Sequence, residues 1–238
     1  MKALLDNEFA PVTLTIGFVE SPFTEYADAF TRWQSELDAK FGTQKEISRF
    51  HAPLSDALLR LEPLVTPLDR YLLIETRSAW TAIFTNGSRG GDVASPVGYL
   101  PTVLKCRGLE VTNVPDRSKS SKPEHRLFGA VVFTLYGPEK TDWLNRIRRV
   151  SVTNDVSGWE FAAHGETQPY EKTENYSKRR VVERFTVEML ESYCRALGIE
   201  VFDANFYGGE CLVSHTTKRS AKPGAAMSIA EARTRLFI

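Results

Sequence analysis

Apolar residues in the first part of the chain follow two different periods. Residues 12–19 (VTLTIGFV) are rich in β-branched side chains, which predicts a strand. After Ser21 and Pro22, apolar side chains recur every three or four residues, which predicts an amphipathic helix over 22–40 with Ser21 as its cap. We expect four side chains to form the buried stripe of this helix: Phe23, Phe30, Trp33 and Leu37.

Further apolar runs, rich in β-branched and aromatic residues, predict a sheet. Residues 71–85 surround Trp80 and predict a hairpin or a long bent strand. Residues 127–136 predict a buried strand, and 146–153 with 158–163 predict a meander. Polar, proline-containing stretches predict loops at 117–126 and 216–225, and the apolar run 201–206 predicts a further strand.

Two predicted helices, at 95–107 and 187–197, end in the same local pattern of glycine, apolar residue, Glu and Val. Glycine is the residue that most readily adopts positive φ at a helix C-terminus. We therefore expect Gly108 and Gly198 to be left-handed caps, each leading directly into a strand.

Hairpins that follow one another along the chain predict an α/β or α+β fold with a mixed, largely antiparallel sheet and packed helices. The length of 238 residues suits one globular domain. The repeated helix-to-strand pattern makes 1–116 and 127–238 candidate related halves. The alternative is that the same capping chemistry is used twice without duplication.

Composition narrows the class of protein. Thirty basic residues balance thirty acidic ones, so no net field draws the chain to nucleic acid or to an anionic membrane. The widely spaced Cys106, Cys194 and Cys211 favour free thiols in a reducing compartment. Neither a secretory signal nor an apolar run of about 18 residues is visible. We expect a cytoplasmic protein, with neither membrane nor nucleic acid among its partners.

No established catalytic or metal-binding motif is present in the sequence. None of the four histidines has the spacing of a zinc ligand, so we expect no metal and no cofactor. The glycine-rich stretch 86–92 is interpreted as a turn rather than an anion site. The arginines of 146–149 are interpreted as part of a solvated sheet edge rather than as phosphate ligands.

Residues 155–184 differ most from a structural scaffold, because aromatic side chains are interspersed with charged ones. Trp, Tyr and Arg are enriched among the residues that dominate binding energy. We predict a binding site formed by Trp159, Tyr170, Glu171 and Arg180. In the alternative interpretation, Trp159 is fully buried and Glu171 is paired with an arginine inside the fold.

The same segment resembles bacterial proteins related to the immunity proteins of polymorphic toxin systems. The resemblance covers about residues 150–200 and implies a protein-binding protein rather than an enzyme. The leading hypothesis is therefore a cofactor-free, protein-binding inhibitor, and the alternative is a hydrolase or transferase with a site around His164, Glu171 and Arg180. The resemblance depends on these residues: Gly158–Phe161, Gly165, Gln168–Glu171, Tyr176 and Arg184–Thr186.

Overall fold

The computed structural model describes residues 2–119, 126–218 and 224–236. Its strands are β1 (Thr15–Val19), β2 (Gln44–His51), β3 (Arg70–Thr76), β4 (Thr81–Thr85), β5 (Gly108–Val114), β6 (Ala130–Thr141), β7 (Leu144–Asp155), β8 (Gly158–Gly165) and β9 (Tyr207–Lys218). Its α-helices are α1 (Phe23–Phe41), α2 (Leu54–Leu59), α3 (Ala94–Leu104), α4 (Val187–Ala196) and α5 (Ile229–Leu236). Its 3-10 helices are η1 (Leu4–Asn7), η3 (Thr173–Ser177), η4 (Val181–Glu183) and η5 (Ala204–Phe206).

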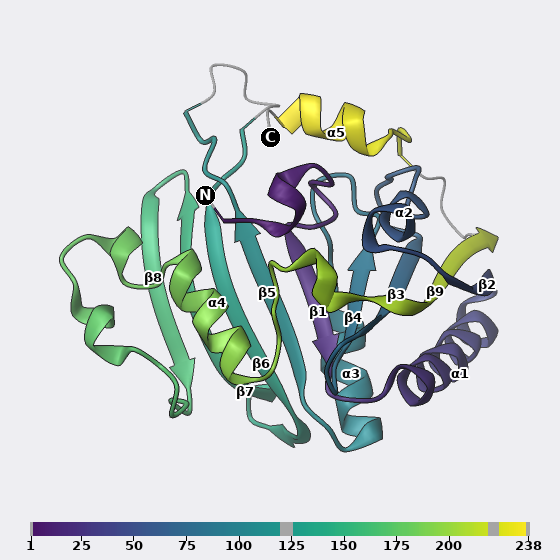
Figure 1. The fold of residues 1–238 in the computed structure, drawn as a ribbon, viewed down its shortest axis with the longest axis horizontal. Helices are drawn as coiled ribbons and strands as arrows, with labels where there is room; N and C mark the ends of the chain where they lie inside the picture. Colours follow the sequence, from purple (N-terminus) through teal and green to yellow (C-terminus); the bar gives the residue numbers. More distant parts are fainter. Residues whose placement is uncertain (1, 120–125, 219–223, 237–238) are drawn as a thin grey trace.

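The strands form one sheet in the order β2-β9-β3-β4-β1-β5-β6-β7-β8, and every pair of neighbours is antiparallel (Figure 1). This arrangement, with helices packed against it, confirms the α+β class. The predicted hairpin over 71–85 is confirmed as β3 and β4, and the predicted meander after residue 146 is confirmed as β7 and β8.

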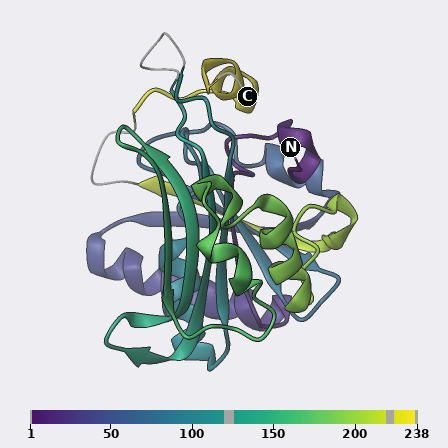
Figure 2. The ribbon, with the colours of Figure 1, turned by 90° about the vertical axis from the view of Figure 1, so that its left-hand side faces the viewer.

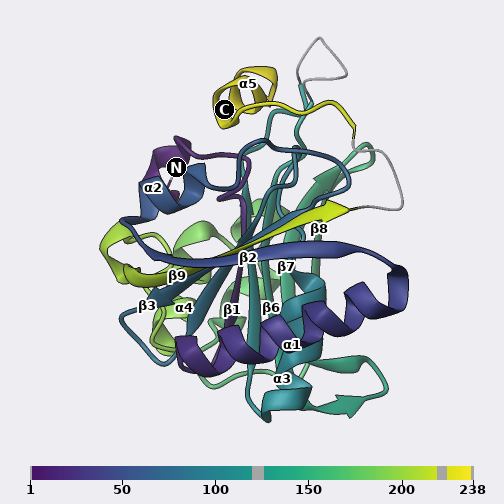
Figure 3. The same ribbon diagram turned by 90° about the vertical axis from the view of Figure 1, so that its right-hand side faces the viewer.

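The C-terminal strand β9 lies between β2 and β3 (Figure 3). A strand from the range 127–238 is thus inserted into the part of the sheet that the range 1–116 builds. The two candidate halves share one continuous sheet in the residues that the structure describes.

The two faces of the sheet have separate cores, because successive side chains of a strand point to opposite faces. Leu73 of β3 belongs to the core that contains residues of α1 and α3, whereas its neighbour Leu72 belongs to the core that contains residues of α2 and α4. Seen from the β8 side, α4 lies on one side of the sheet and α1 on the other (Figure 2).

The predicted helix over 22–40 is confirmed as α1. Phe23 and Phe30 are buried as expected, but Trp33 and Leu37 are only half-buried. Trp33 packs against Tyr99 of α3, which is itself exposed, so this part of the stripe lies at the rim of the core. The prediction that Ser21 caps this helix is wrong. The N-cap position is occupied by Pro22, and no side chain makes a capping hydrogen bond there.

Only one of the two predicted glycine caps is present. Gly198 has φ 79°, and Ile199 N–H donates to the Cys194 carbonyl in the manner of a Schellman motif. At the other junction, Lys105 takes the left-handed position with φ 55°. Gly108 instead begins β5, where a Cβ atom would lie 2.2 Å from the Val97 carbonyl oxygen. That glycine is required by the close approach of α3, not by a helix cap.

The predicted strand over 201–206 is wrong. These residues form a turn and η5, and the strand begins at Tyr207. The second junction therefore does not lead directly from helix to strand. The two sequence patterns that look alike at 95–111 and 187–201 thus adopt different structures.

Two predicted loops lie partly outside the described residues, namely 120–125 within 117–126 (with His125) and 219–223 within 216–225. Residues 216–218, expected in a loop, belong to β9. No helix among residues 2–119, 126–218 and 224–236 is long and apolar enough to cross a lipid bilayer.

Candidate functional site

The segment 166–186 connects β8 to α4 and contains no regular structure except η3 and η4. Connections longer than about 12–15 residues are uncommon in compact domains and are usually functional or disordered. This one is held in place by side-chain hydrogen bonds. We call it the clamped segment.

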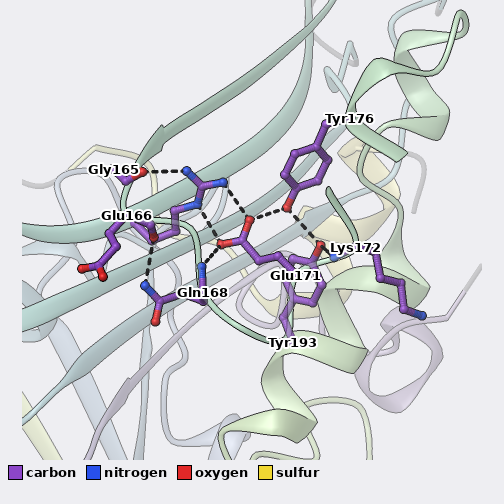
Figure 4. A network of polar contacts seen from close by, with 8 residues as sticks. Gly165, Glu166, Gln168, Glu171, Lys172, Tyr176 and Tyr193 are labelled. Atoms are coloured by element: carbon purple, nitrogen blue, oxygen red, sulfur yellow. Dashed lines mark hydrogen bonds and ion pairs between the residues drawn. The ribbon is translucent and has the colours of Figure 1, made fainter. Parts of the chain in front are cut away.

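The centre of this attachment is an ion pair between Arg148 of β7 and Glu171 (Figure 4). Arg148 Nε donates to Glu171 Oε1 at 2.8 Å, and Arg148 Nη2 donates to Glu171 Oε2 at 2.7 Å. The two side chains are 5% and 0% exposed, so both charges are removed from water. Such burial is costly, and it is offset here by bidentate geometry and by further hydrogen bonds.

Those further bonds come from three elements. Arg148 Nη1 donates to the Gly165 carbonyl at 2.8 Å, and Gln168 N–H donates to Glu171 Oε1 at 2.8 Å. Tyr176 donates its hydroxyl to Glu171 Oε2 at 2.7 Å and lies 3.0 Å from the hydroxyl of Tyr193 on α4. The network therefore joins β7, the clamped segment and α4 (Figure 4).

The backbone takes part as well, because Lys172 N–H donates to the Tyr193 hydroxyl at 2.8 Å. Burial, with the hydrogen bonds to Tyr193 and Glu171, raises the pKa of Tyr176 far above its ordinary value. Burial alone lowers the pKa of Arg148, but the bond and charge of Glu171 outweigh burial and raise it. Both groups are thus kept in the protonated forms that donate to the carboxylate.

The four predicted site residues do not converge on one point. Glu171 is inside the network, and the half-buried ring of Tyr170 packs against Phe133 and Tyr193. Trp159 stands 36% exposed on β8, and the exposed Arg180 pairs with Glu183 at 2.8 Å.

This placement combines the two interpretations of the segment. A partly exposed Trp159 is what a binding surface requires. A Glu171 locked to an arginine is what the scaffold interpretation states. We conclude that Glu171 and Tyr170 attach the clamped segment to β7 and α4, while Trp159 on β8 and Arg180 on the segment are exposed.

The residues of the alternative enzymatic site lie on different faces. His164 is the register partner of Arg149, and Arg149 is the neighbour of Arg148 on the same strand. Successive side chains of a strand alternate, so His164 lies on the face opposite to the Arg148–Glu171 pair. The structure does not bring His164 and Glu171 together.

Sequence reasoning missed Arg148 and Tyr193. The sequence contains a clue to Arg148: it lies two residues before Val150 and four before Val152, so in a strand its side chain points to the same face as these core residues. A charged residue in that register requires a buried partner. Reasoning also missed a depression on the other face, which is lined by Trp143, Arg146, Arg149 and His164.

Among the described residues, no group of three or more His, Cys, Asp or Glu side chains is positioned to hold a metal ion. Neither protein-family models, nor curated proteins, nor solved structures match the chain. The resemblance to immunity proteins stays a prediction.

Proposed function

We propose that this chain is a protein-binding protein that uses β8 and the outer side of the clamped segment as its interface. The supporting observation is the buried Arg148–Glu171 pair with its tyrosine hydroxyls. It holds a long segment of irregular backbone in one conformation while the outer side of that segment stays in water.

The physical argument concerns the cost of ordering. A flexible segment loses conformational entropy when it binds, and a segment that is already ordered avoids most of that loss. A buried ion pair is weak evidence for stability, and the best-supported reason to retain one is conformational specificity. Here the conformation that is specified belongs to an exposed segment, which suits a preorganised binding surface.

The chemistry of the exposed side indicates the type of partner. Trp159 and the 93% exposed Val156 provide apolar area at the β7–β8 turn and the edge strand. The clamped segment itself carries more basic than acidic exposed side chains, which favours an acidic partner and fast, electrostatically steered association. Its exposed charges are Glu166, Lys172, Glu174, Lys178, Arg179 and Arg180.

The resemblance to immunity proteins supports a finer version, in which the partner is a toxin that this chain inhibits without a cofactor. The test is a binding screen against the proteins encoded by the genes next to the gene for this chain. For a confirmed partner, the charge-reversed double variant Arg179→Glu/Arg180→Glu should weaken binding at least about tenfold, since interface arginines often dominate affinity.

The matched control is Lys40→Glu, an exposed charge reversal at the end of α1. It should leave the dissociation constant unchanged. Equal affinities of the wild type, the double variant and the control would remove the clamped segment from the interface and overturn the proposal.

A further inference from the structure

The face of β6–β8 opposite the clamped segment carries a second cluster of basic and aromatic side chains. Helix α3 meets β7 near the start of the strand, where Asn145 Nδ2 donates to the Gly98 carbonyl at 2.6 Å. Beside this contact lies a shallow depression of about 660 Å³, lined by Trp143, Arg146, Arg149 and His164.

The residues that line the depression come from the turn between β6 and β7, from β7 and from β8. Trp143 belongs to the turn between β6 and β7, and His164 stands on β8 with its ring centre 6.0 Å from that of Trp143. The Arg146 guanidinium lies over two rings, 5.3 Å from the centre of Trp143 and 5.8 Å from that of Tyr136. Stacking of this kind holds the guanidinium plane in a defined orientation.

The two arginines retain unused donor capacity. Neither forms an ion pair with a carboxylate in the part of the chain that the structure describes. Among the described residues, Arg149 Nη1 donates to the hydroxyl of Thr134, at 3.1 Å. Arg146 Nε is buried without a hydrogen-bond partner among them, and the Arg146 side chain interacts with the Tyr136 hydroxyl, so the donors left for a ligand are the other guanidinium nitrogens of the two arginines. Glu110 of β5 pairs in register with Thr134 of β6, which in turn pairs with Arg149 of β7. The Glu110 carboxylate accepts from the Tyr136 hydroxyl at 3.0 Å and forms no ion pair with Arg149.

These features select the ligand chemistry. A guanidinium binds a carboxylate through two parallel hydrogen bonds, and the Trp143 ring offers an apolar surface beside that contact. Arginine and aromatic side chains also suit nucleic acid, but binding to phosphates depends on a positive field. The chain has equal numbers of basic and acidic residues, so a short acidic protein segment is the better fit.

We infer that this depression binds an acidic segment of a partner protein, with carboxylates on Arg146 and Arg149 and an apolar side chain against Trp143. The inference depends on the proposed function only in taking a protein as the ligand. It adds a second contact surface, on the opposite face of β7 and β8 from the clamped segment.

The experiment uses the full chain and a fluorescein-labelled peptide of alternating Glu and Tyr, followed by fluorescence anisotropy. A peptide with Gln in place of Glu and a short oligothymidine are the comparison probes. The Glu peptide should bind, and the Gln peptide should bind at least about tenfold more weakly, because charge-assisted bonds are lost. Raising the salt from about 0.01 M to 0.15 M should weaken binding of the Glu peptide.

Variants of the chain distinguish binding at this depression from nonspecific attraction of the peptide to positive charge. Arg146→Gln, Arg149→Gln and Trp143→Ala should each weaken binding of the Glu peptide at least about fivefold, as expected for anchors of an interface. The control variants Arg32→Gln and Arg77→Gln remove exposed arginine charges on α1 and after β3, outside the lining of the depression, and they should leave binding unchanged.

Three results would overturn the inference: no binding of the Glu peptide, equal losses in the Arg32 and Arg77 controls, or tighter binding of oligothymidine than of the peptide at the same residues. The proposed function is tested separately, by the Arg179 and Arg180 variants against a whole partner protein. A partner that is lost on those changes but bound normally by Arg146→Gln/Arg149→Gln would leave the proposed function standing and remove this second surface.

Discussion

Arg148 and Arg149 are adjacent in the sequence and differ in almost every structural respect. Arg148 is 4% exposed and bound at three of its nitrogens, two of them to Glu171. Arg149 is half-buried on the other face of β7, and within the described part of the chain its guanidinium donates only to a threonine hydroxyl. The first arginine is part of the internal structure, and the second is available to a ligand. The difference follows from strand alternation and from what covers each face.

The comparison teaches that the two faces of the β7–β8 hairpin serve different purposes. On the α4 face, a charged residue in the core register is satisfied by a residue from the clamped segment. On the α3 face, Arg146 and Arg149 line an open depression beside the contact between Asn145 and α3. The α4 face therefore fixes the conformation of the clamped segment, and the α3 face exposes arginine side chains to a ligand.

The largest expected effect is on stability, in the Arg148→Ala variant. This change leaves the buried carboxylate of Glu171 without its counter-ion, which should cost about 3–5 kcal/mol of the free energy of unfolding. Urea denaturation followed by circular dichroism measures it. A loss below about 1 kcal/mol would show that water or another cation reaches Glu171, and the comparison would fail.

The Tyr176→Phe variant should have the next largest effect. It removes a hydroxyl that donates to a buried carboxylate, and a hydrogen bond to a charged group contributes about 1.5–3 kcal/mol. The control is Tyr99→Phe, because the Tyr99 side chain is 47% exposed and should tolerate the change within about 0.5 kcal/mol. Equal midpoints for the two variants in urea would contradict the prediction.

The same hydroxyl should give stability a pH dependence. The pKa of Tyr176 is raised in the folded protein above the value of 10.0 for a free tyrosine. The folded state therefore holds the proton more tightly than the unfolded state, and this contribution is fully present below pH about 10 and lost as pH rises further. Tyr176→Phe should reduce the slope of unfolding free energy against pH above that value. An unchanged slope would show that Tyr176 does not titrate differently in the two states.

Replacing both members of the pair sharpens the question of what the pair is for. Arg148→Met with Glu171→Leu removes both charges together, and such replacements are often neutral or stabilising by about 1–4 kcal/mol. Global stability should therefore recover relative to Arg148→Ala. Hydrogen exchange of the amides of 166–186 should become faster, because the bonds to Gln168 N–H and Tyr176 are gone. Unchanged protection there would mean that the pair does not order the segment.

The smallest expected effect on stability is in Arg149→Ala, which should change the free energy of unfolding by less than about 0.5 kcal/mol. The reason is that its guanidinium makes one hydrogen bond to the residues that the structure describes, on a partly solvated face. The measurement is the same urea titration as for Arg148→Ala. A cost similar to that of Arg148→Ala would erase the distinction between the two faces.

Elements whose cause is local agree best with sequence reasoning. Helix α4 begins where Thr186 Oγ1 accepts from Met189 N–H, and α5 begins with a Ser228–Glu231 capping box. Ser and Thr are preferred cap residues, and a Glu three positions after Ser is a recognisable sequence signature of such a cap. Helix α1 and the β7–β8 hairpin follow from periodicity alone. At the α3–β5 junction, by contrast, the glycine pattern misled, because the packing of α3 on β5 determines what Gly108 does.

The candidate site shows the same division. Residues 155–184 stood out by composition, and Trp159 and Arg180 are exposed there. The partner of Glu171 was out of reach of local reasoning, because Arg148 is 23 residues away and on another strand. The sequence indicates only a solvated edge for Arg146 and Arg149, whereas the structure places Arg146 over the rings of Trp143 and Tyr136 and both arginines in the lining of one depression.

The sequence by itself determined the class of fold, the amphipathic α1, the successive hairpins and the caps of α4 and α5. Each of these depends on backbone preferences and hydrogen bonds between residues a few positions apart. Only the tertiary structure decided the insertion of β9 between β2 and β3, the pairing of Arg148 with Glu171, and which face of β7 stays open. These depend on which apolar surfaces meet and which charges lose their water, and those contacts join residues that are distant in the chain.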